Sequence, residues 1–250
     1  MSEYFLQHPL QPMLRKLNYW TPLDEADKGA LLALPHSIQH IDAHGYIVQE
    51  GDKPTHSCVM LSGYSIREKV LASGARQIVS IHMRGDLVDL QNSLLRCADH
   101  SVQTLVRSKV AYIPREAILA IAREHPNVGF AMWYDTLVDA SVFREWIANI
   151  GRRDARTRMA HLFCEFAVRL RLAGLAAGDY ELPMTQEQLA DATGMTAVHA
   201  NRTIRSLEEN GLIRRVSSRV IHIENWKELA SAGEFDSAYL HLHDDERAIA

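Results

Sequence analysis

The most informative part of the sequence lies between residues 184 and 213 and reads Met184-Thr-Gln-Glu-Gln-Leu-Ala-Asp-Ala-Thr-Gly-Met-Thr-Ala-Val-His-Ala-Asn-Arg-Thr-Ile-Arg-Ser-Leu-Glu-Glu-Asn-Gly-Leu-Ile213. Thr185 has the side chain of an N-cap, and Gln188 follows at the spacing of a capping box. Gly194 permits a sharp chain reversal, and Thr196 can cap a second helix. The stretch therefore predicts two helices joined by a tight turn, a helix-turn-helix.

The second predicted helix, residues 196–207, has two chemically different faces when its residues are placed 100° apart. The face expected to pack inward carries Ala197, Ala200, Ile204 and Leu207. The opposite face carries Val198, His199, Arg202, Arg205 and Ser206, with Asn201 at its edge. Guanidinium, imidazole and amide groups on one exposed face can read base edges and hold phosphates. We therefore expect this helix to contact DNA, together with the cap residues Thr185 and Thr196.

A basic hairpin is expected after these helices, because Arg214-Arg-Val-Ser-Ser-Arg-Val220 places a two-residue tip, Ser217-Ser218, between two β-rich runs. Between residues 202 and 219 there are five arginines and two glutamates, a local charge of about +3. The arginines are Arg202, Arg205, Arg214, Arg215 and Arg219. The last three either meet DNA phosphates from a wing or protect an exposed strand edge. The sequence leaves both interpretations open.

The region from about residue 38 to 113 has a different texture, with short β-rich runs closed by turn residues. The expected strands are 46–48, 57–61, 64–66, 77–81, 100–106 and 109–113. Short strands at this spacing predict a small barrel or sandwich.

A long helix is expected over residues 127–150, where no proline interrupts the chain. An apolar stripe recurs at three- and four-residue steps. It consists of Phe130, Trp133, Leu137, Ala140 (or Ser141), Arg144 and Ile147. The stripe either faces the core of its own chain or packs against a second copy, and we expect the second arrangement because the preceding barrel is complete without it. A further helix is expected over residues 155–172.

The overall composition restricts the classes of function that the chain can have. The net charge of −4 excludes nucleic-acid coating by bulk charge, so a local basic surface must make any DNA contact. We expect a cytoplasmic protein without a signal peptide or membrane span, because no basic and apolar leader and no long apolar run occur. Three distant cysteines, Cys58, Cys97 and Cys164, fit neither a disulfide framework nor a metal knot. We found no phosphate loop, nucleophile elbow or zinc-protease motif and expect no enzyme.

The sequence resembles the Crp/Fnr family of bacterial regulators from about residue 20 to 223. In the barrel the resemblance rests on Val48-Gln-Glu-Gly-Asp52, Met60-Leu-Ser-Gly-Tyr64 and Gly85-Asp-Leu87. In the DNA reader it rests on Thr185-Gln-Glu-Gln-Leu-Ala190 and on Asn201-Arg202 through Asn210-Gly-Leu-Ile213. Any one piece is weak, but the combination is specific.

The resemblance implies an α+β chain of four parts. These are a β-roll (jelly-roll) sensor domain over residues 1–125, a dimerisation helix over 126–150, a winged helix-turn-helix over 151–236 and a flexible tail over 237–250. It also implies a homodimer that binds a palindrome on double-stranded DNA, works with RNA polymerase, and acts as an activator or a repressor. The alternative is a cyclic-nucleotide-type sensor or interaction protein without sequence-specific DNA binding, which would need no basic reader helix.

The implied effector pocket departs from the cyclic-AMP-binding pattern of a Gly-Glu-Leu turn and an Arg-Ser/Thr pair. The matching residues are Gly85, Asp86, Leu87, Asp89, Cys97, His100 and Ser101. No arginine stands at the expected place, and Asp89 and Asp99 would repel a phosphate, although Arg96 or Arg107 could supply the charge. We therefore expect no cyclic nucleotide, and no iron–sulfur cluster either, because three cysteines cannot supply four ligands.

Other effectors stay open at this point. Haem would need axial ligands such as His56, His82 or His100, and Cys97 could respond to oxidation. The recognition helix also keeps only the cap Thr196 and the final Arg202 of the family's Ser/Thr-Arg-Glu-x-x-x-Arg pattern. We therefore expect an operator different from that of the cyclic AMP receptor protein, with His199 and Asn201 as distinguishing readers.

Overall fold

A computed structural model describes residues 8–175, 180–217 and 220–243 of the chain. The described chain divides into two compact units, and the boundary between them falls inside one long helix. Of the described residues, the first unit comprises 8–69 and 80–137, and the second comprises 70–79, 138–175, 180–217 and 220–243.

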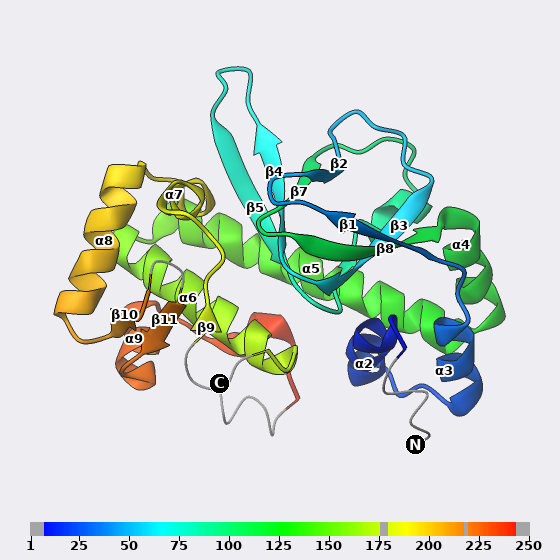
Figure 1. The fold of residues 1–250 in the computed structure, drawn as a ribbon. Coiled ribbons are helices and arrows are strands. Elements are labelled where there is room, and N and C mark those ends of the chain that lie inside the picture. The colour runs from blue at the N-terminus through cyan, green and yellow to red at the C-terminus, as the bar shows by residue number, and fades with distance from the viewer. Residues whose placement is uncertain (1–7, 176–179, 218–219, 244–250) are drawn as a thin grey trace. The chain divides into compact units, whose positions relative to one another are not determined.

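Two antiparallel sheets form a roll with helices around it, and apart from residues 70–79 this roll belongs to the first unit (Figure 1). One sheet has the strand order β1-β8-β3-β6 and the other β2-β7-β4-β5. The strands are β1 (Ser37–Ile41), β2 (Tyr46–Val48), β3 (His56–Ser62), β4 (Ser65–Val70), β5 (Arg76–His82), β6 (Leu87–Val88), β7 (Ser101–Thr104) and β8 (Ser108–Pro114). The β-roll expected from the sequence is confirmed, although β1 and the two-residue β6 were not expected.

The helices of this unit are α2 (Gln11–Trp20), α3 (Glu25–Leu32), the 3-10 helix η1 (Leu90–Ser93), α4 (Arg115–Glu124) and the first part of α5 (Pro126–Arg152). Neither α2 nor α3 corresponds to an element expected from the sequence. Their leucines share a core with β3, β8, α4 and the start of α5, in which Leu17, Leu31 and Ile113 are fully buried. A second cluster inside the roll includes Cys58, Met60 and Val110.

The second unit contains a helix-turn-helix and a three-stranded sheet with the order β10-β11-β9 (Figure 1). Its helices are the rest of α5, α6 (Ala155–Leu172), α7 (Gln186–Thr193), α8 (Ala197–Glu209), α9 (Trp226–Ala232) and the 3-10 helix η2 (Ser237–Leu240). Its strands are β9 (Tyr180–Glu181), β10 (Ile213–Arg215) and β11 (Val220–Ile223). The expected helix over residues 155–172 is confirmed. The long helix expected over residues 127–150 is confirmed, and α5 extends it by one residue at its start and two at its end.

The C-terminal segment corrects another expectation. A flexible tail was predicted from residue 237, yet η2 forms there and Leu240 and Leu242 are buried. A polar network holds this segment on α6, because His161 lies 3.1 Å from both the Gly233 carbonyl oxygen and the Tyr239 hydroxyl, and that hydroxyl donates to Glu165. Contacts so distant along the chain have no local signature in the sequence. Residues 244–250 of the predicted tail lie outside the described residues.

Candidate functional site

The helix-turn-helix forms through the local interactions that its sequence predicts. Thr185 and Gln188 make a reciprocal capping box at the start of α7. Gly194 has φ +64° and an ideal Cβ there would stand 3.1 Å from Ile150, so both backbone conformation and space favour glycine. The Thr196 hydroxyl caps α8 by accepting a hydrogen bond from the His199 amide at 3.3 Å. The predicted caps and turn are confirmed.

Arg158 of α6 stabilises this turn from beneath. Its Nη1 donates to the Thr193 carbonyl oxygen at 2.8 Å, and its Nε donates to the Arg153 carbonyl oxygen at 2.9 Å. A cation at the end of α7 is favourable because the last carbonyls of a helix carry partial negative charge. The turn between the two helices is therefore fixed by a side chain that the sequence analysis did not identify.

The two faces of α8 are largely those predicted. Ala200, Thr203, Ile204 and Leu207 are buried. Val198, His199, Arg202 and Arg205 are exposed. Ala197 corrects the prediction, because it is exposed in the first turn while Thr203 takes a place in the core. Ser206 is half-buried, and so is Asn201, whose Nδ2 donates to Gln186 Oε1 at 2.6 Å.

The wing arginines have partners that reduce their available charge. Arg215 makes a two-point ion pair with Glu208, with Nε–Oε1 at 2.9 Å and Nη2–Oε2 at 2.5 Å. The hydrogen bond from Arg215 lowers the pKa of Glu208 and keeps that carboxylate ionised. Arg214 pairs with Glu224. The local +3 estimated from the sequence left out Glu224, and Arg219 lies outside the described residues.

No ion pair involves Arg202 or Arg205 among the described residues of the chain, which distinguishes these two arginines from Arg214 and Arg215. The protein therefore presents two guanidinium groups without an ion pair on the exposed face of α8, although the charge of Arg205 also helps to lower the pKa of Glu208. Such groups are available for base edges or phosphates without breaking an internal pair.

The implied effector residues take part in different contacts of the roll. Asp89 and His100 meet inside the roll, with Oδ1 and Nε2 2.8 Å apart. Asp86 instead lies 2.8 Å from Lys16, and its Oδ2 accepts from the Met83 amide. Leu87 is buried in β6, Gly85 approaches the Pro12 carbonyl, and the Ser101 hydroxyl accepts from the Glu50 amide at 3.0 Å.

A buried arginine from β4 lies beside Asp89, although no arginine stands at the position where the family pattern has one. Arg67 Nη2 lies 2.9 Å from Asp89 Oδ1, and both side chains are buried. Arg96 and Arg107, which the sequence analysis considered, do not take this place, and Arg107 pairs with Asp42 at 3.7 Å. Burial alone would raise the pKa of Asp89, but the hydrogen bond from His100 and the charge of Arg67 outweigh burial and lower that pKa to about 2.

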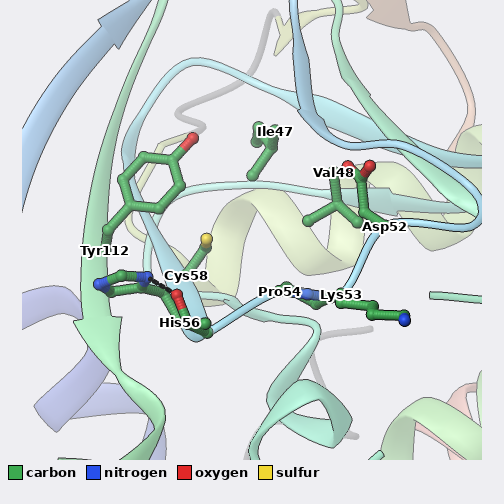
Figure 2. A pocket seen from close by; sticks show the side chains of 9 residues that line it. Ile47, Val48, Asp52, Lys53, Pro54, His56, Cys58 and Tyr112 are labelled. Carbon is green, nitrogen blue, oxygen red and sulfur yellow. Dashed lines mark hydrogen bonds between the residues drawn. The ribbon is translucent and has the colours of Figure 1, made fainter. Parts of the chain in front are cut away.

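A cavity of about 320 Å³ opens elsewhere in the roll (Figure 2). It is lined by Ile47, Val48, Asp52, Lys53, Pro54, Thr55, His56, Cys58 and Tyr112. Burial raises the pKa of Tyr112 to about 12 and also raises the pKa of the Cys58 thiol, so both groups stay protonated at neutral pH. These neutral hydroxyl and thiol groups share the cavity with apolar side chains and with the charged residues Asp52 and Lys53.

The three thiols differ in accessibility. Cys97 is exposed, whereas Cys58 and Cys164 are buried. Burial raises the pKa of Cys164 as it does that of Cys58. His100, one of the histidines considered for haem, has both ring nitrogens within 2.8 Å of the carboxylates of Asp89 and Asp99. No group of three metal-binding side chains occurs in the part of the chain that the structure describes.

Two family models match the chain. The cyclic nucleotide-binding domain matches residues 38–125, and the Crp-like helix-turn-helix domain matches residues 157–232. The chain belongs to the Crp/Fnr family. It is a DNA-binding transcription regulator. None of the helices in the described ranges has the length and apolar character needed to cross a membrane.

Named relatives of this Crp/Fnr regulator agree with that assignment. The transcriptional activator protein FnrL of Cereibacter sphaeroides is 23% identical over 195 residues, covering 76% of this chain and 78% of FnrL. The nitrogen fixation regulation protein FixK of Bradyrhizobium diazoefficiens is 25% identical over 174 residues, covering 70% of this chain and 73% of FixK. The solved structure of FixK2 from Bradyrhizobium japonicum superposes with a TM-score of 0.74 at 22% identity, covering 80% of this chain and 98% of FixK2, and this shows the shared fold.

Proposed function

We propose that this regulator binds double-stranded DNA as a homodimer and inserts α8 into the major groove of a palindromic operator. The observation that carries the proposal is the division of α8, whose inner face is buried while Arg202 and Arg205 stand exposed without an ion pair among the described residues. A helix of this kind fits the major groove, and a two-fold dimer requires a two-fold operator.

The exposed face of α8 supplies both polar and apolar readers. We assign Arg202 to a guanine, because a guanidinium can donate to two acceptors on one guanine edge. Val198, which is 67% exposed, is assigned to a thymine methyl group. His199 offers a further ring nitrogen. Asn201 is held by Gln186 and presents its carbonyl oxygen from a fixed position.

Other residues are assigned to the DNA backbone. Arg205 lies near the later turns of α8 and would meet a phosphate, as would the hydroxyls of Thr185, Thr196 and Ser206. Arg214, Arg215 and Arg219 of the wing are proposed phosphate contacts as well. For Arg214 and Arg215 a phosphate must compete with Glu224 and Glu208, so we expect a smaller contribution from each.

The dimer is assigned to the apolar stripe of α5. Phe130 is 58% exposed, Trp133 61%, Leu137 52% and Ile147 72%, which is unusual for such large apolar side chains. Phe130 and Trp133 also stack on one another. Together with Ala140 and Arg144, these residues would face the same stripe of a second copy in an isologous contact.

We further propose that the protein is a cytoplasmic regulator that works with RNA polymerase, carries no cofactor and catalyses no reaction. These assignments are supported by the family alone.

Selection from a random duplex library tests the proposed operator. We expect a palindrome whose half-site centres lie about one helical turn, ~34 Å, apart. Replacing thymine by uracil at each selected position removes one methyl group and identifies the partner of Val198, because Val198→Ala should lose that preference. A monomer that selects no motif would contradict the proposal.

A further inference from the structure

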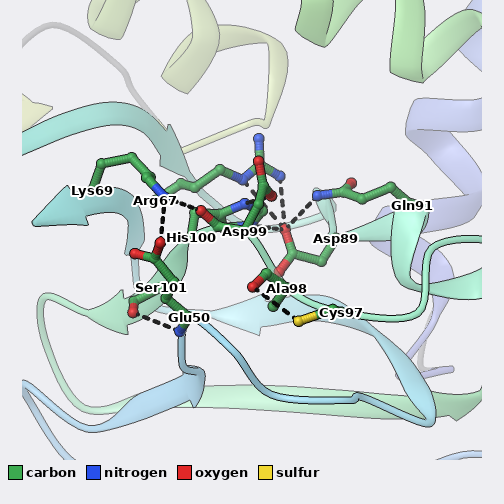
Figure 3. Close-up of polar contacts among 10 residues, drawn as sticks. All are labelled: Glu50, Arg67, Lys69, Asp89, Gln91, Cys97, Ala98, Asp99, His100 and Ser101. Atoms are coloured by element: carbon green, nitrogen blue, oxygen red, sulfur yellow. Dashed lines mark hydrogen bonds and ion pairs between the residues drawn. The ribbon is translucent and has the colours of Figure 1, made fainter.

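The roll contains a buried carboxylate on which several donors converge (Figure 3). Asp89 Oδ1 lies 2.9 Å from Arg67 Nη2, 3.3 Å from Arg67 Nε, 2.8 Å from His100 Nε2 and 3.1 Å from Gln91 Nε2. The donors come from β4, from η1 and from the residue before β7. Groups from three separate segments thus share one acceptor atom.

The backbone at Asp89 is unusual for a residue with a side chain. Asp89 has φ +57° and ψ +46°, the left-handed conformation in which glycine is unstrained. It joins β6 to η1 and is fully buried. A buried charge and a left-handed backbone both oppose folding, so this arrangement persists because the contacts of the carboxylate offset both costs.

A second set of contacts holds the His100 donor independently of Asp89. His100 Nδ1 lies 2.7 Å from Asp99 Oδ1, which orients the ring so that Nε2 faces inward. Lys69 in turn contacts the Asp99 carbonyl oxygen and Glu50 Oε1. The His100 ring is therefore held by its neighbours as well as by Asp89.

We propose that Arg67, His100 and Gln91 form an anion-binding cradle and that Asp89 is its built-in ligand. The class of ligand is a small oxyanion, a carboxylate or a phosphate oxygen. In the native chain the Asp89 carboxylate fills the cradle, so no external anion enters it, and a cyclic nucleotide would have to displace a covalently attached competitor. This inference concerns the roll alone and does not depend on DNA binding.

The high local concentration of the Asp89 carboxylate explains why it occupies the cradle in preference to a dissolved anion. A group attached to the chain competes without the loss of freedom that a dissolved anion suffers on binding. Removing the carboxylate should therefore expose a site that the native protein conceals. Glycine is the substitution of choice, because φ +57° suits it and the backbone can stay as it is.

Chemical rescue of Asp89→Gly tests the proposal. Thermal unfolding of the variant is followed in sodium formate, sodium acetate and sodium phosphate, each against sodium chloride at equal ionic strength. Formate or acetate should restore several degrees of Tm in a saturable way, with a midpoint of roughly millimolar concentration as expected for so small a ligand. The native protein should show no such saturable response.

Two matched variants control this experiment. His44→Gly also places glycine at a left-handed position of the roll, φ +66°, but lies outside the cradle, so anions should not affect it specifically. Asp89→Gly combined with Arg67→Met removes the cation and should abolish rescue. A folded Asp89→Gly that shows no anion-specific rescue, or a native protein with the same response, overturns the proposal.

Asp89→Asn keeps the test decisive if the glycine variant does not fold. It retains the size of the side chain and removes only its charge, leaving Arg67 buried beside a neutral amide. The proposal predicts that Arg67→Met partly restores the stability lost in Asp89→Asn, because the buried cation that has lost its ion pair with Asp89 then disappears. Strictly additive losses in the double variant would overturn it.

Discussion

At the scale of single residues, Asp89 links the stability of the roll to pH. Its pKa falls from 3.8 to about 2 on folding, so the ionised carboxylate stabilises the fold above pH 4 and this stabilisation is lost as pH falls from 4 towards 2. At about 1.36 kcal/mol per unit the contribution is on the order of 2 kcal/mol. Comparing the native chain with Asp89→Asn isolates this contribution, because the other carboxylates titrate in both proteins and their effects cancel in the difference.

Urea unfolding of both proteins measures the effect. We expect Asp89→Asn to be less stable by on the order of 2 kcal/mol at pH 7, and the difference between the two proteins to shrink below pH 4. A difference that stays constant down to pH 3 would show that the charge of Asp89 contributes nothing.

Arg202 and Arg205 should respond differently to replacement by alanine. Arg202→Ala should relax the preference at one base pair, by roughly 1–3 kcal/mol of discrimination. Arg205→Ala should weaken all sequences alike and reduce the slope of log K against log salt by about one. Fluorescence anisotropy with the selected operator and single-base variants, at several salt concentrations, separates these outcomes. An unchanged base preference in Arg202→Ala would contradict its assignment to a guanine.

At the scale of elements, α5 carries the prediction about assembly. Trp133→Glu places a charge in the exposed apolar stripe, and the lost burial of roughly 2–3 kcal/mol plus the cost of an unpaired charge should weaken the dimer at least tenfold. Sedimentation equilibrium measures the change. Arg123→Glu adds a glutamate at an exposed position of α4 and should leave the dimer intact. A native chain that is already monomeric would contradict the assignment of this stripe.

The helices and strands differ in how well they could be predicted from the sequence. The helix-turn-helix was predictable because its signals are local: Thr185 caps with Gln188 three residues away, and Gly194 adopts the turn conformation itself. Arg67 was missed because its partner Asp89 lies 22 residues away in another segment. The strand expected over residues 64–66 ended before the charged residue Arg67, yet β4 continues through Arg67 to Val70.

The distinction between local signals and contacts distant in sequence also applies to the elements near the two ends of the chain. The first turn of α3 has a capping box, made by Asp24 and Asp27, but the helices α2 and α3 are short and gain stability from a shared core that no local pattern shows. The packing of η2 on α6 depends on His161 and Tyr239, which are 78 residues apart. Local rules determine caps and turns, whereas burial of a polar residue depends on partners that only the fold brings together.

At the scale of the whole molecule, the occupied cradle predicts that cyclic nucleotides have no effect on DNA binding. The affinity of the full chain for its operator should be the same with and without millimolar cyclic AMP or cyclic GMP, because the Asp89 carboxylate already neutralises Arg67. Isothermal titration of the full chain should show no saturable heat. Micromolar binding that disappears in Arg67→Met would contradict this prediction.

The unequal burial of the three thiols makes the native chain a ready-made spectroscopic probe. Cys97 is exposed, while burial keeps Cys58 and Cys164 protonated and covered. A maleimide or nitroxide reagent at pH 7 should therefore modify one cysteine per folded chain and three after denaturation, which mass spectrometry counts directly. In a two-fold dimer the two labels are symmetry-related, so pulsed electron spin resonance would report a single inter-label distance, and its change on adding operator would follow the sensor unit without any engineered cysteine.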